Sequence, residues 1–292
     1  MTAETALART ECTPWWWERV PRPALPAATI PSECDVAIVG SGYTGLHAAL
    51  VTARAGRHTV VFDAEDAGFG CSTRNGGQIS TSVKPSFAAL ARRHGKERAF
   101  ELLKEGQRSL AFVGDFVRSE RIECDFARGG TLAFARSGVQ LTRARAEVEH
   151  GRSWGDTEAD LRLLAPAEVA EISGVSGALG ATFTPHCAAL DPGRLVRALA
   201  EVVASLGVRL FEGTPATRIG TDRRVHTPHG AVSAEFVVRA TEAYTPSLRG
   251  AKRDLAPVYS LIIGTDPLPA GTLAEIGDRP RAARSDRCPG RG

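Results

Sequence analysis

The sequence predicts an α/β protein (α+β overall), with one domain built from two separated segments and a second, mixed-sheet domain inserted between them. Strand-length apolar runs alternate with helical patterns towards both ends of the chain, whereas the middle is mixed. A glycine-rich turn joins the first strand to the first helix. At 292 residues, 43% of them apolar, the chain can bury two cores. No apolar stretch reaches the ~20 residues of a spanning helix, so we expect a cytoplasmic protein without a membrane span.

The first βαβ unit is expected between residues 34 and 63. Cys34–Val39 is a short β-branched run, typical of a buried parallel strand. The run Leu46–Ala55 is rich in Ala and Leu and predicts a helix, with Gly56 placed to end it. Thr59–Phe62 predicts a second buried strand.

The middle of the chain predicts helices and a hairpin. Apolar residues at helical spacing between Pro85 and Arg121 predict one long helix or two shorter ones. Ile122–Phe126 and Thr131–Phe134 flank two glycines and predict a β-hairpin. Further helices are expected over 138–151 and 166–172, and a strand over 178–183. Beyond Asp191 the α/β pattern returns, with a helix over 195–206, a strand over 208–211, a hairpin over 225–232 and a buried strand over 235–239.

The charge balance gives no support for nucleic-acid binding. The net charge is +3, but residues 279–292 carry five Arg and one Asp, so the first 278 residues sum to −1. A nearly neutral body lacks the basic footprint of a nucleic-acid-binding or membrane-surface protein. The six cysteines form no CxxC pair, which favours free thiols over a metal site or a disulfide framework.

The turn after the first strand carries a dinucleotide-binding pattern. Gly40-Ser-Gly-Tyr-Thr-Gly45 follows a strand and opens a helix, and Asp63 lies 18 positions after the last glycine. In this pattern the glycines permit a tight turn, close approach of a pyrophosphate, and close packing of helix on strand. The acidic residue accepts hydrogen bonds from ribose hydroxyls. The sequence therefore predicts a Rossmann-like, dinucleotide-binding fold, although NAD and FAD share the pattern.

A second glycine-rich segment, Gly68–Gln78, separates these alternatives. Four of the ten residues from 68 to 77 are Gly, and they are interleaved with Ser72, Thr73, Arg74 and Asn75. Such a segment can surround a long polar cofactor with hydrogen-bond donors. The alternative is a mobile surface loop.

The chain resembles FAD-dependent oxidoreductases of the D-amino-acid oxidase superfamily, and most closely the gamma-glutamylputrescine oxidoreductase branch. The resemblance rests on the aromatic arm Trp15–Trp17, the fingerprint Gly40–Gly45, the segment 68–78, and weaker matches at 190–192, 207–212, 237–244, 257–260 and 265–268. It implies an FAD-binding domain at 33–90 and 188–250 and a substrate domain at 91–187 and 251–278. An extended arm is expected at 1–32, and residues 279–292 form a basic tail that is atypical of the family.

The resemblance also implies the residues that hold FAD. They are expected in the fingerprint, at the end of the second strand, in the glycine-rich segment and in two later loops: Gly40, Ser41, Gly42, Tyr43, Thr44, Gly45, Asp63, Ala64, Gly70, Ser72, Arg74, Asn75, Gly76, Gly77, Gln78, Ala216, Ala240 and Thr241. The implied reaction is oxidation of a C–N bond in an amine or amino acid, gamma-glutamylputrescine-like or D-amino-acid-like, by hydride transfer to flavin. No catalytic side chain is assigned.

Other residues carry weaker expectations. His226 and His229 flank a Pro–Gly turn, which favours an exposed hairpin over a metal site. His186 is expected to be structural or exposed, with contact to substrate as the alternative. Cys71 is expected to pack rather than to bind flavin covalently. The three tryptophans are expected to pack on the domain surface, with a substrate entrance as the alternative.

The C-terminal composition suggests a truncated or shifted reading frame near residue 279. Apolar periodicity ends there and basic charge rises, whereas relatives of the resembling family continue further. Two interpretations follow: an active enzyme, alone or with a complementary C-terminal chain, or a catalytically inactive fragment that binds FAD or another nucleotide. Glu242 stands where relatives often carry Asn.

Overall fold

The computed structural model describes residues 10–21, 29–81, 86–265 and 267–275. The predicted tail at 279–292 and half of the predicted arm lie outside these residues. The described chain forms two compact units. The first comprises the described residues up to Gln78 together with Phe112–Phe126 and Ala189–Ile262, and the second comprises the remainder. The functional division into domains stays a prediction.

The first unit is built on a six-stranded sheet in the order β10-β11-β12-β1-β2-β9. Strands β12, β1, β2 and β9 run parallel to one another, whereas β10 and β11 join antiparallel at the edge. The strands span Arg218–Ile219 (β10), Arg224–Thr227 (β11), Gly230–Arg239 (β12), Glu33–Val39 (β1), Thr59–Phe62 (β2) and Arg209–Phe211 (β9). This architecture confirms the predicted Rossmann-like α/β fold.

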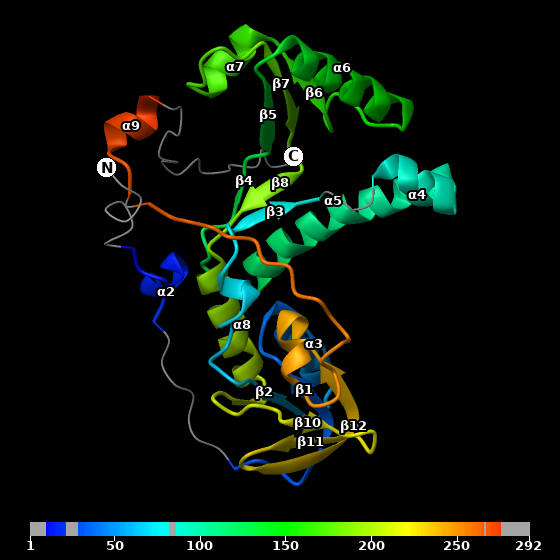
Figure 1. The fold of residues 1–292 in the computed structure, drawn as a ribbon, viewed down its shortest axis with the longest axis vertical. Helices are drawn as coiled ribbons and strands as arrows, with labels where there is room; N and C mark the ends of the chain where they lie inside the picture. The colour runs from blue at the N-terminus through cyan, green and yellow to red at the C-terminus, as the bar shows by residue number, and fades with distance from the viewer. Residues whose placement is uncertain (1–9, 22–28, 82–85, 266, 276–292) are drawn as a thin grey trace, which may run out of the picture. The chain divides into compact units, whose positions relative to one another are not determined.

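Helix α3 (Tyr43–Arg54) packs on the sheet of the first unit, and α8 (Pro192–Ser205) packs against α3 (Figure 1). The apolar stripe of α8 consists of Leu195, Val196, Leu199 and Val203, which recur at helical spacing and are buried. Asp191 caps this helix, because its Oδ1 accepts the Arg194 N–H at 3.0 Å. Because α3 follows β1 after a turn of three residues, its N-terminus lies at the carboxyl edge of the sheet.

The predicted βαβ unit is confirmed, with one difference at the start of the helix. Helix α3 begins at Tyr43, directly after Gly42, rather than at Leu46. Strand β12 corrects a second expectation, since the hairpin arm and the strand predicted over 235–239 are one continuous ten-residue strand. It is also less buried than expected, because Phe236 is 54% exposed.

The arm before β1 contains a short helix, α2 (Trp15–Glu18), where an extended chain was expected. The Trp16 indole N–H donates to the Asn75 carbonyl, and the Trp17 indole N–H donates to Thr73 Oγ1, each at 2.8 Å. Of the two expectations for the tryptophans, the structure shows packing against the domain.

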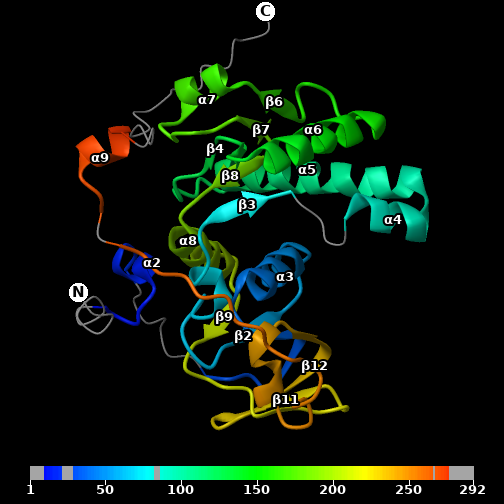
Figure 2. The ribbon, with the colours of Figure 1, turned by 45° about the horizontal axis from the view of Figure 1, so that its top comes forward.

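The second unit contains two three-stranded sheets and several helices (Figure 2). The sheets have the orders β3-β8-β4 and β5-β7-β6. Their strands are β3 (Gln78–Ser80), β8 (Cys187–Ala189), β4 (Ala127–Arg128), β5 (Thr131–Ala135), β7 (Gly180–Thr184) and β6 (Arg162–Leu164). The helices are α4 (Phe87–His94), the part of α5 (Lys96–Ser119) before Phe112, α6 (Gly138–Ser153), α7 (Pro166–Ile172) and α9 (Ala270–Glu275). Of these, α6 and α7 pack on the sheet β5-β7-β6. Among the described residues, no helix has both the length and the apolar composition needed to cross a membrane.

The hairpin predicted over 122–134 is wrong. Strand β5 pairs antiparallel with β7, and β4 lies beside β8, so the two strands flanking the glycines belong to different sheets. Residues 122–126 form no strand, and Asp125 has a left-handed φ of 54°. Gly130, with φ 74°, redirects the chain, and a Cβ there would lie 2.4 Å from the Thr184 carbonyl oxygen. The two glycines therefore lie where the chain passes from one sheet to the other, and they do not form the turn of a hairpin.

The second unit contains a hydrogen-bonded carboxylate that predicts a pH-dependent stability. Asp160 accepts hydrogen bonds from the N–H and the hydroxyl of Thr157 and from His186 Nε2, and Lys104 Nζ lies at 3.5 Å. Partial burial acts to raise the pKa of Asp160, but these hydrogen bonds and the Lys104 charge outweigh it and hold that pKa well below its usual range.

We expect D160N to lower the free energy of unfolding by about 1–3 kcal/mol at neutral pH, because it weakens a charge-assisted network. A carboxylate whose pKa is depressed on folding stabilises above its unfolded pKa, and this stability is lost as pH falls towards the folded pKa. The deficit of D160N should therefore shrink below about pH 4 in urea titrations. The matched control is E158Q, since Glu158 is 77% exposed and pairs only at the surface with Arg152. An equal deficit at neutral and acidic pH contradicts the prediction.

Candidate functional site

The turn between β1 and α3 needs glycine at its first and last positions. Gly40 has φ 104°, and a Cβ on it would lie 2.3 Å from the Ala240 carbonyl oxygen. A Cβ on Gly45 would lie 1.8 Å from the Gly40 carbonyl oxygen, so the helix packs directly against the turn. On Gly42 a Cβ would meet Ser72 Oγ at 2.9 Å. Gly40 and Gly45 therefore exclude a side chain where the chain passes from strand to helix, because the atoms they would meet belong to the backbone.

The first turn of α3 directs backbone N–H groups towards this edge of the sheet, because the first N–H groups of a helix have no intrahelical acceptor. The Tyr43 N–H donates to Ser72 Oγ at 3.0 Å, while Gly42 and Thr44 line an adjacent cavity. Helix N-termini carry partial positive charge and bind phosphates.

Asp63 follows β2 and is held by the turn. Its Oδ2 accepts both the N–H and the hydroxyl of Ser41 at 2.6 Å, and its Oδ1 accepts the Glu65 N–H at 3.1 Å. Ser41 is buried, with 1% of its surface exposed. Hydrogen bonds from Ser41, which precedes it by 22 residues, thus fix the Asp63 carboxylate. Asp63 lines the same cavity as Gly42.

A cavity of about 420 Å³ lies within the first unit, at the carboxyl edge of its parallel strands. In open α/β sheets this edge is where ligands bind, and the volume falls in the range of small-molecule sites. It is lined by Val39, Gly40, Gly42, Tyr43, Thr44, Phe62, Asp63, Ala64, Glu65, Phe69, Gly70, Cys71, Ser72, Pro215, Ala216, Ala240, Thr241, Glu242, Tyr244, Ser247 and Leu248.

Eleven of the eighteen residues proposed from the sequence line this cavity: Gly40, Gly42, Tyr43, Thr44, Asp63, Ala64, Gly70, Ser72, Ala216, Ala240 and Thr241. Two others contact lining residues without lining the cavity themselves: Ser41 donates to Asp63, and Gly45 packs against the Gly40 carbonyl. The remaining five, Arg74, Asn75, Gly76, Gly77 and Gln78, are not among the lining residues. Their role towards a cofactor stays a prediction.

The segment 71–77 is held by its own side chains and by the arm. The Asn75 side chain donates to the carbonyls of Cys71 and Ser72 and accepts the Gly77 N–H, so it stabilises the loop internally. The Arg74 guanidinium lies 4.9 Å from the Trp17 ring centroid and 4.7 Å from that of Phe69. This loop is an ordered part of the first unit rather than an isolated surface loop.

Sequence reasoning missed ten lining residues: Val39, Phe62, Glu65, Phe69, Cys71, Pro215, Glu242, Tyr244, Ser247 and Leu248. Most are sequence neighbours of predicted residues, and the ends of parallel strands would have indicated Val39 and Phe62. Tyr244, Ser247 and Leu248 follow from η2 (Glu242–Ser247), a 3₁₀ helix that the sequence did not predict.

The titratable groups of the cavity are mostly acidic. Asp63, Glu65 and Glu242 line it, and within the described chain no Lys, Arg or His is among the lining residues. Burial, and next the nearby Glu242 charge, raise the pKa of the Cys71 thiol, which keeps it unreactive. Burial likewise raises the pKa of Tyr43. Binding of an anion here therefore depends on backbone N–H groups.

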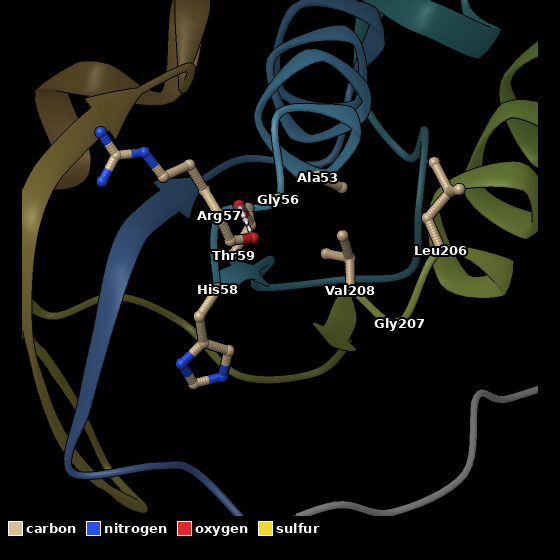
Figure 3. A pocket seen from close by; sticks show the side chains of 8 residues that line it. All are labelled: Ala53, Gly56, Arg57, His58, Thr59, Leu206, Gly207 and Val208. Atoms are coloured by element: carbon tan, nitrogen blue, oxygen red, sulfur yellow. Dashed lines mark hydrogen bonds between the residues drawn. The ribbon is translucent and has the colours of Figure 1, made fainter.

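A second depression, of about 300 Å³, lies at the opposite edge of the sheet, at the C-terminal ends of α3 and α8 (Figure 3). It is lined by Ala53, Gly56, Arg57, His58, Thr59, Leu206, Gly207 and Val208. Helix C-termini carry partial negative charge, which opposes phosphate binding. Arg57 and His58 are also engaged, by Glu235 and Arg209 respectively.

The three histidines singled out in the sequence lie away from the cavity. His186 Nε2 is hydrogen-bonded to Asp160 at 2.8 Å within the second unit, which is the structural role expected. His226 lies on β11 and His229 in the turn before β12.

The fold and the cavity define a nucleotide-binding α/β domain, with a glycine-rich turn and an acidic residue at the carboxyl edge of a parallel sheet. Comparison with known proteins gives the family. The model of the family described as FAD dependent oxidoreductase (DAO) matches residues 35–291, and the chain belongs to that family. The cofactor of this family is FAD.

Related sequences support the same family. The chain is 33% identical over 249 residues to gamma-glutamylputrescine oxidoreductase of Escherichia coli, covering 80% of this chain and 55% of that protein. It is 27% identical over 253 residues to the probable oxidoreductase OrdL of Haemophilus influenzae, covering 84% and 58%. The chain thus spans little more than half the length of these relatives. The comparisons do not support a complementary C-terminal chain.

Solved structures show the same fold. Glycine oxidase from Geobacillus kaustophilus superposes with a TM-score of 0.65 at 21% identity, covering 76% of this chain and 59% of that one. L-amino acid deaminase from Proteus myxofaciens superposes with a TM-score of 0.64 at 18% identity, covering 80% and 51%.

The residues of the cavity fit the adenosine diphosphate part of FAD. Gly40 and Gly42 both line the cavity and carry no side chain that would stand between a ligand and the backbone. The α3 N-terminus offers donors to phosphates, and Asp63 offers a fixed carboxylate to ribose hydroxyls.

Proposed function

We propose that this chain binds FAD in the cavity of the first unit and that the protein oxidises the C–N bond of an amine or amino acid. One observation carries the proposal: the cavity joins the α3 N-terminus, Asp63 and the loop after β12 at one edge of the sheet. The family match supports FAD as the ligand.

In the proposed arrangement the backbone of the α3 turn binds the diphosphate, and Asp63 binds the adenosine ribose. Ala216 contacts the adenine, while Ala240 and Thr241 contact the phosphates. Ser72 orients the first turn of α3 by accepting the Tyr43 N–H. We further propose that Arg74, Asn75, Gly76, Gly77 and Gln78 act towards the flavin half by shaping the loop.

The substrate class is proposed from relatives. Gamma-glutamylputrescine oxidoreductase, at 33% identity, is named for an amine, and glycine oxidase of Bacillus licheniformis, at 26% identity, is named for an amino acid. When bound, flavin accepts a hydride from the carbon that bears the substrate nitrogen. The protein then has to position that carbon and exclude water.

The first experiment measures cofactor binding. Calorimetric titration of the purified protein should give one FAD site per chain, and FMN should bind far more weakly because it lacks the adenosine that the cavity holds. FMN binding as tight as FAD binding would place the recognition elsewhere. No FAD binding at all overturns the proposal.

The second experiment measures chemistry. Anaerobic addition of a panel of amines and amino acids to the FAD-loaded protein should bleach the flavin absorbance with at least one class. FAD binding without reduction by any of them would favour nucleotide binding without catalysis, the alternative interpretation.

A further inference from the structure

Glu242 is the residue of the cavity whose charge opposes its proposed ligand. It begins η2, three residues after Arg239 ends β12, and it lines the cavity together with Ala240 and Thr241. Because β12 pairs in parallel with β1, this position lies beside the glycine turn that follows β1. A Cβ on Gly40 would touch the Ala240 carbonyl, which confirms the close approach.

The backbone and the carboxylate of Glu242 are both constrained. Its φ of 41° is in the left-handed region that non-glycine residues rarely occupy. The carboxylate accepts the N–H of the next residue, Ala243, and its Oε2 lies 3.7 Å from Cys71 Sγ. Ser72, beside Cys71, accepts the Tyr43 N–H. Two contacts therefore connect the carboxylate with the first turn of α3.

The partners of the Glu242 carboxylate are hydrogen-bond donors without a charge. Among the ion pairs of the described residues, none includes this carboxylate. Arg74 is close enough to lower the pKa of Cys71, but its guanidinium packs on Trp17 and Phe69 and does not line the cavity. A phosphate bound at the α3 N-terminus would therefore meet a negative charge on the side of β12.

We propose that Glu242 is a specificity-determining residue that selects ligands by phosphate charge. This inference rests on the proposed function. The Glu242 carboxylate weakens the binding of a ligand in proportion to the negative charge of the ligand's phosphates. FAD carries a diphosphate diester with two charges, whereas the terminal phosphate of ADP adds most of a third. Glu242 thus disfavours free ADP more than FAD, and it leaves uncharged adenosine unaffected. Since the residue is exposed, each charge pair contributes little, as is usual at a surface.

The test is a titration of adenosine, FAD and ADP against the wild type, E242Q and E242D by calorimetry. E242Q keeps the shape and removes the charge, so it should bind FAD about fivefold more tightly, ADP with a larger gain, and adenosine with an unchanged constant. E242D keeps the charge, so its affinities relative to the wild type should not increase from adenosine to FAD to ADP as those of E242Q do. The FAD gain of E242Q should shrink between roughly 0.05 M and roughly 1 M salt, because salt screens the repulsion.

The matched control is E235Q, which removes one negative charge from β12 outside the cavity, where Glu235 pairs with Arg57. It should leave all three constants unchanged. Equal gains for adenosine and ADP, or equal gains in E242Q and E242D, overturn the charge selection. FAD binding with the same constant in wild type and E242Q overturns it alone, whereas no FAD binding in either protein overturns the proposed function as well.

Discussion

Replacing Gly45 by alanine should abolish FAD binding and destabilise the first unit. Alanine in a helix interior normally stabilises by about 1 kcal/mol relative to glycine. Here the new Cβ would lie 1.8 Å from the Gly40 carbonyl oxygen, which is backbone and cannot rotate away. Displacing the turn or the helix costs about 3 kcal/mol or more, so the clash outweighs the propensity.

The loss should appear in two measurements. The free energy of unfolding of G45A should fall, and its FAD affinity should decrease by at least about 100-fold, since 1.4 kcal/mol corresponds to a factor of ten. The control is G138A at the start of α6, where a Cβ meets nothing within 4 Å. A G45A protein that binds FAD within about twofold of the wild type would show that the turn does not hold the ligand.

The βαβ unit could be predicted because each of its signals is local. The β-branched run of β1, the glycine turn and the run of β2 follow one another within thirty residues, and β1 and β2 pair with each other. The hairpin at 122–134 failed for the opposite reason. Its strands pair with β7 and β8, about fifty residues later, and no local pattern specifies such partners.

The candidate site was predictable where one residue type carries one physical task. Gly40 and Asp63 follow from the requirements of a phosphate-binding turn and a ribose-binding carboxylate. Tyr244 and Glu242 instead reach the cavity because η2 turns the chain after β12, where the Ala240 carbonyl packs closely against Gly40. Such contacts are set by tertiary structure.

Replacing Asp63 by alanine should lower the affinity for every adenosine-containing ligand and also destabilise the turn. Oδ2 of Asp63 accepts two hydrogen bonds from Ser41, which is 1% exposed. Without the carboxylate these buried donors lose their acceptor, at about 1–3 kcal/mol for each. The ribose also loses its proposed acceptor, so adenosine should bind about tenfold more weakly or worse. That loss distinguishes Asp63 from Glu242, whose removal should leave adenosine binding unchanged.

The variant S41A separates the two roles of Asp63. It removes the hydroxyl donor but keeps the backbone N–H and the carboxylate, so it should cost only about 1 kcal/mol of stability. Because Ser41 is buried behind the turn and does not line the cavity, adenosine affinity should change by less than about twofold. If S41A weakened adenosine binding as much as D63A, the carboxylate would act by holding the turn. A loss confined to D63A instead assigns Asp63 to the ribose, since the stability change alone would not weaken binding in the folded protein.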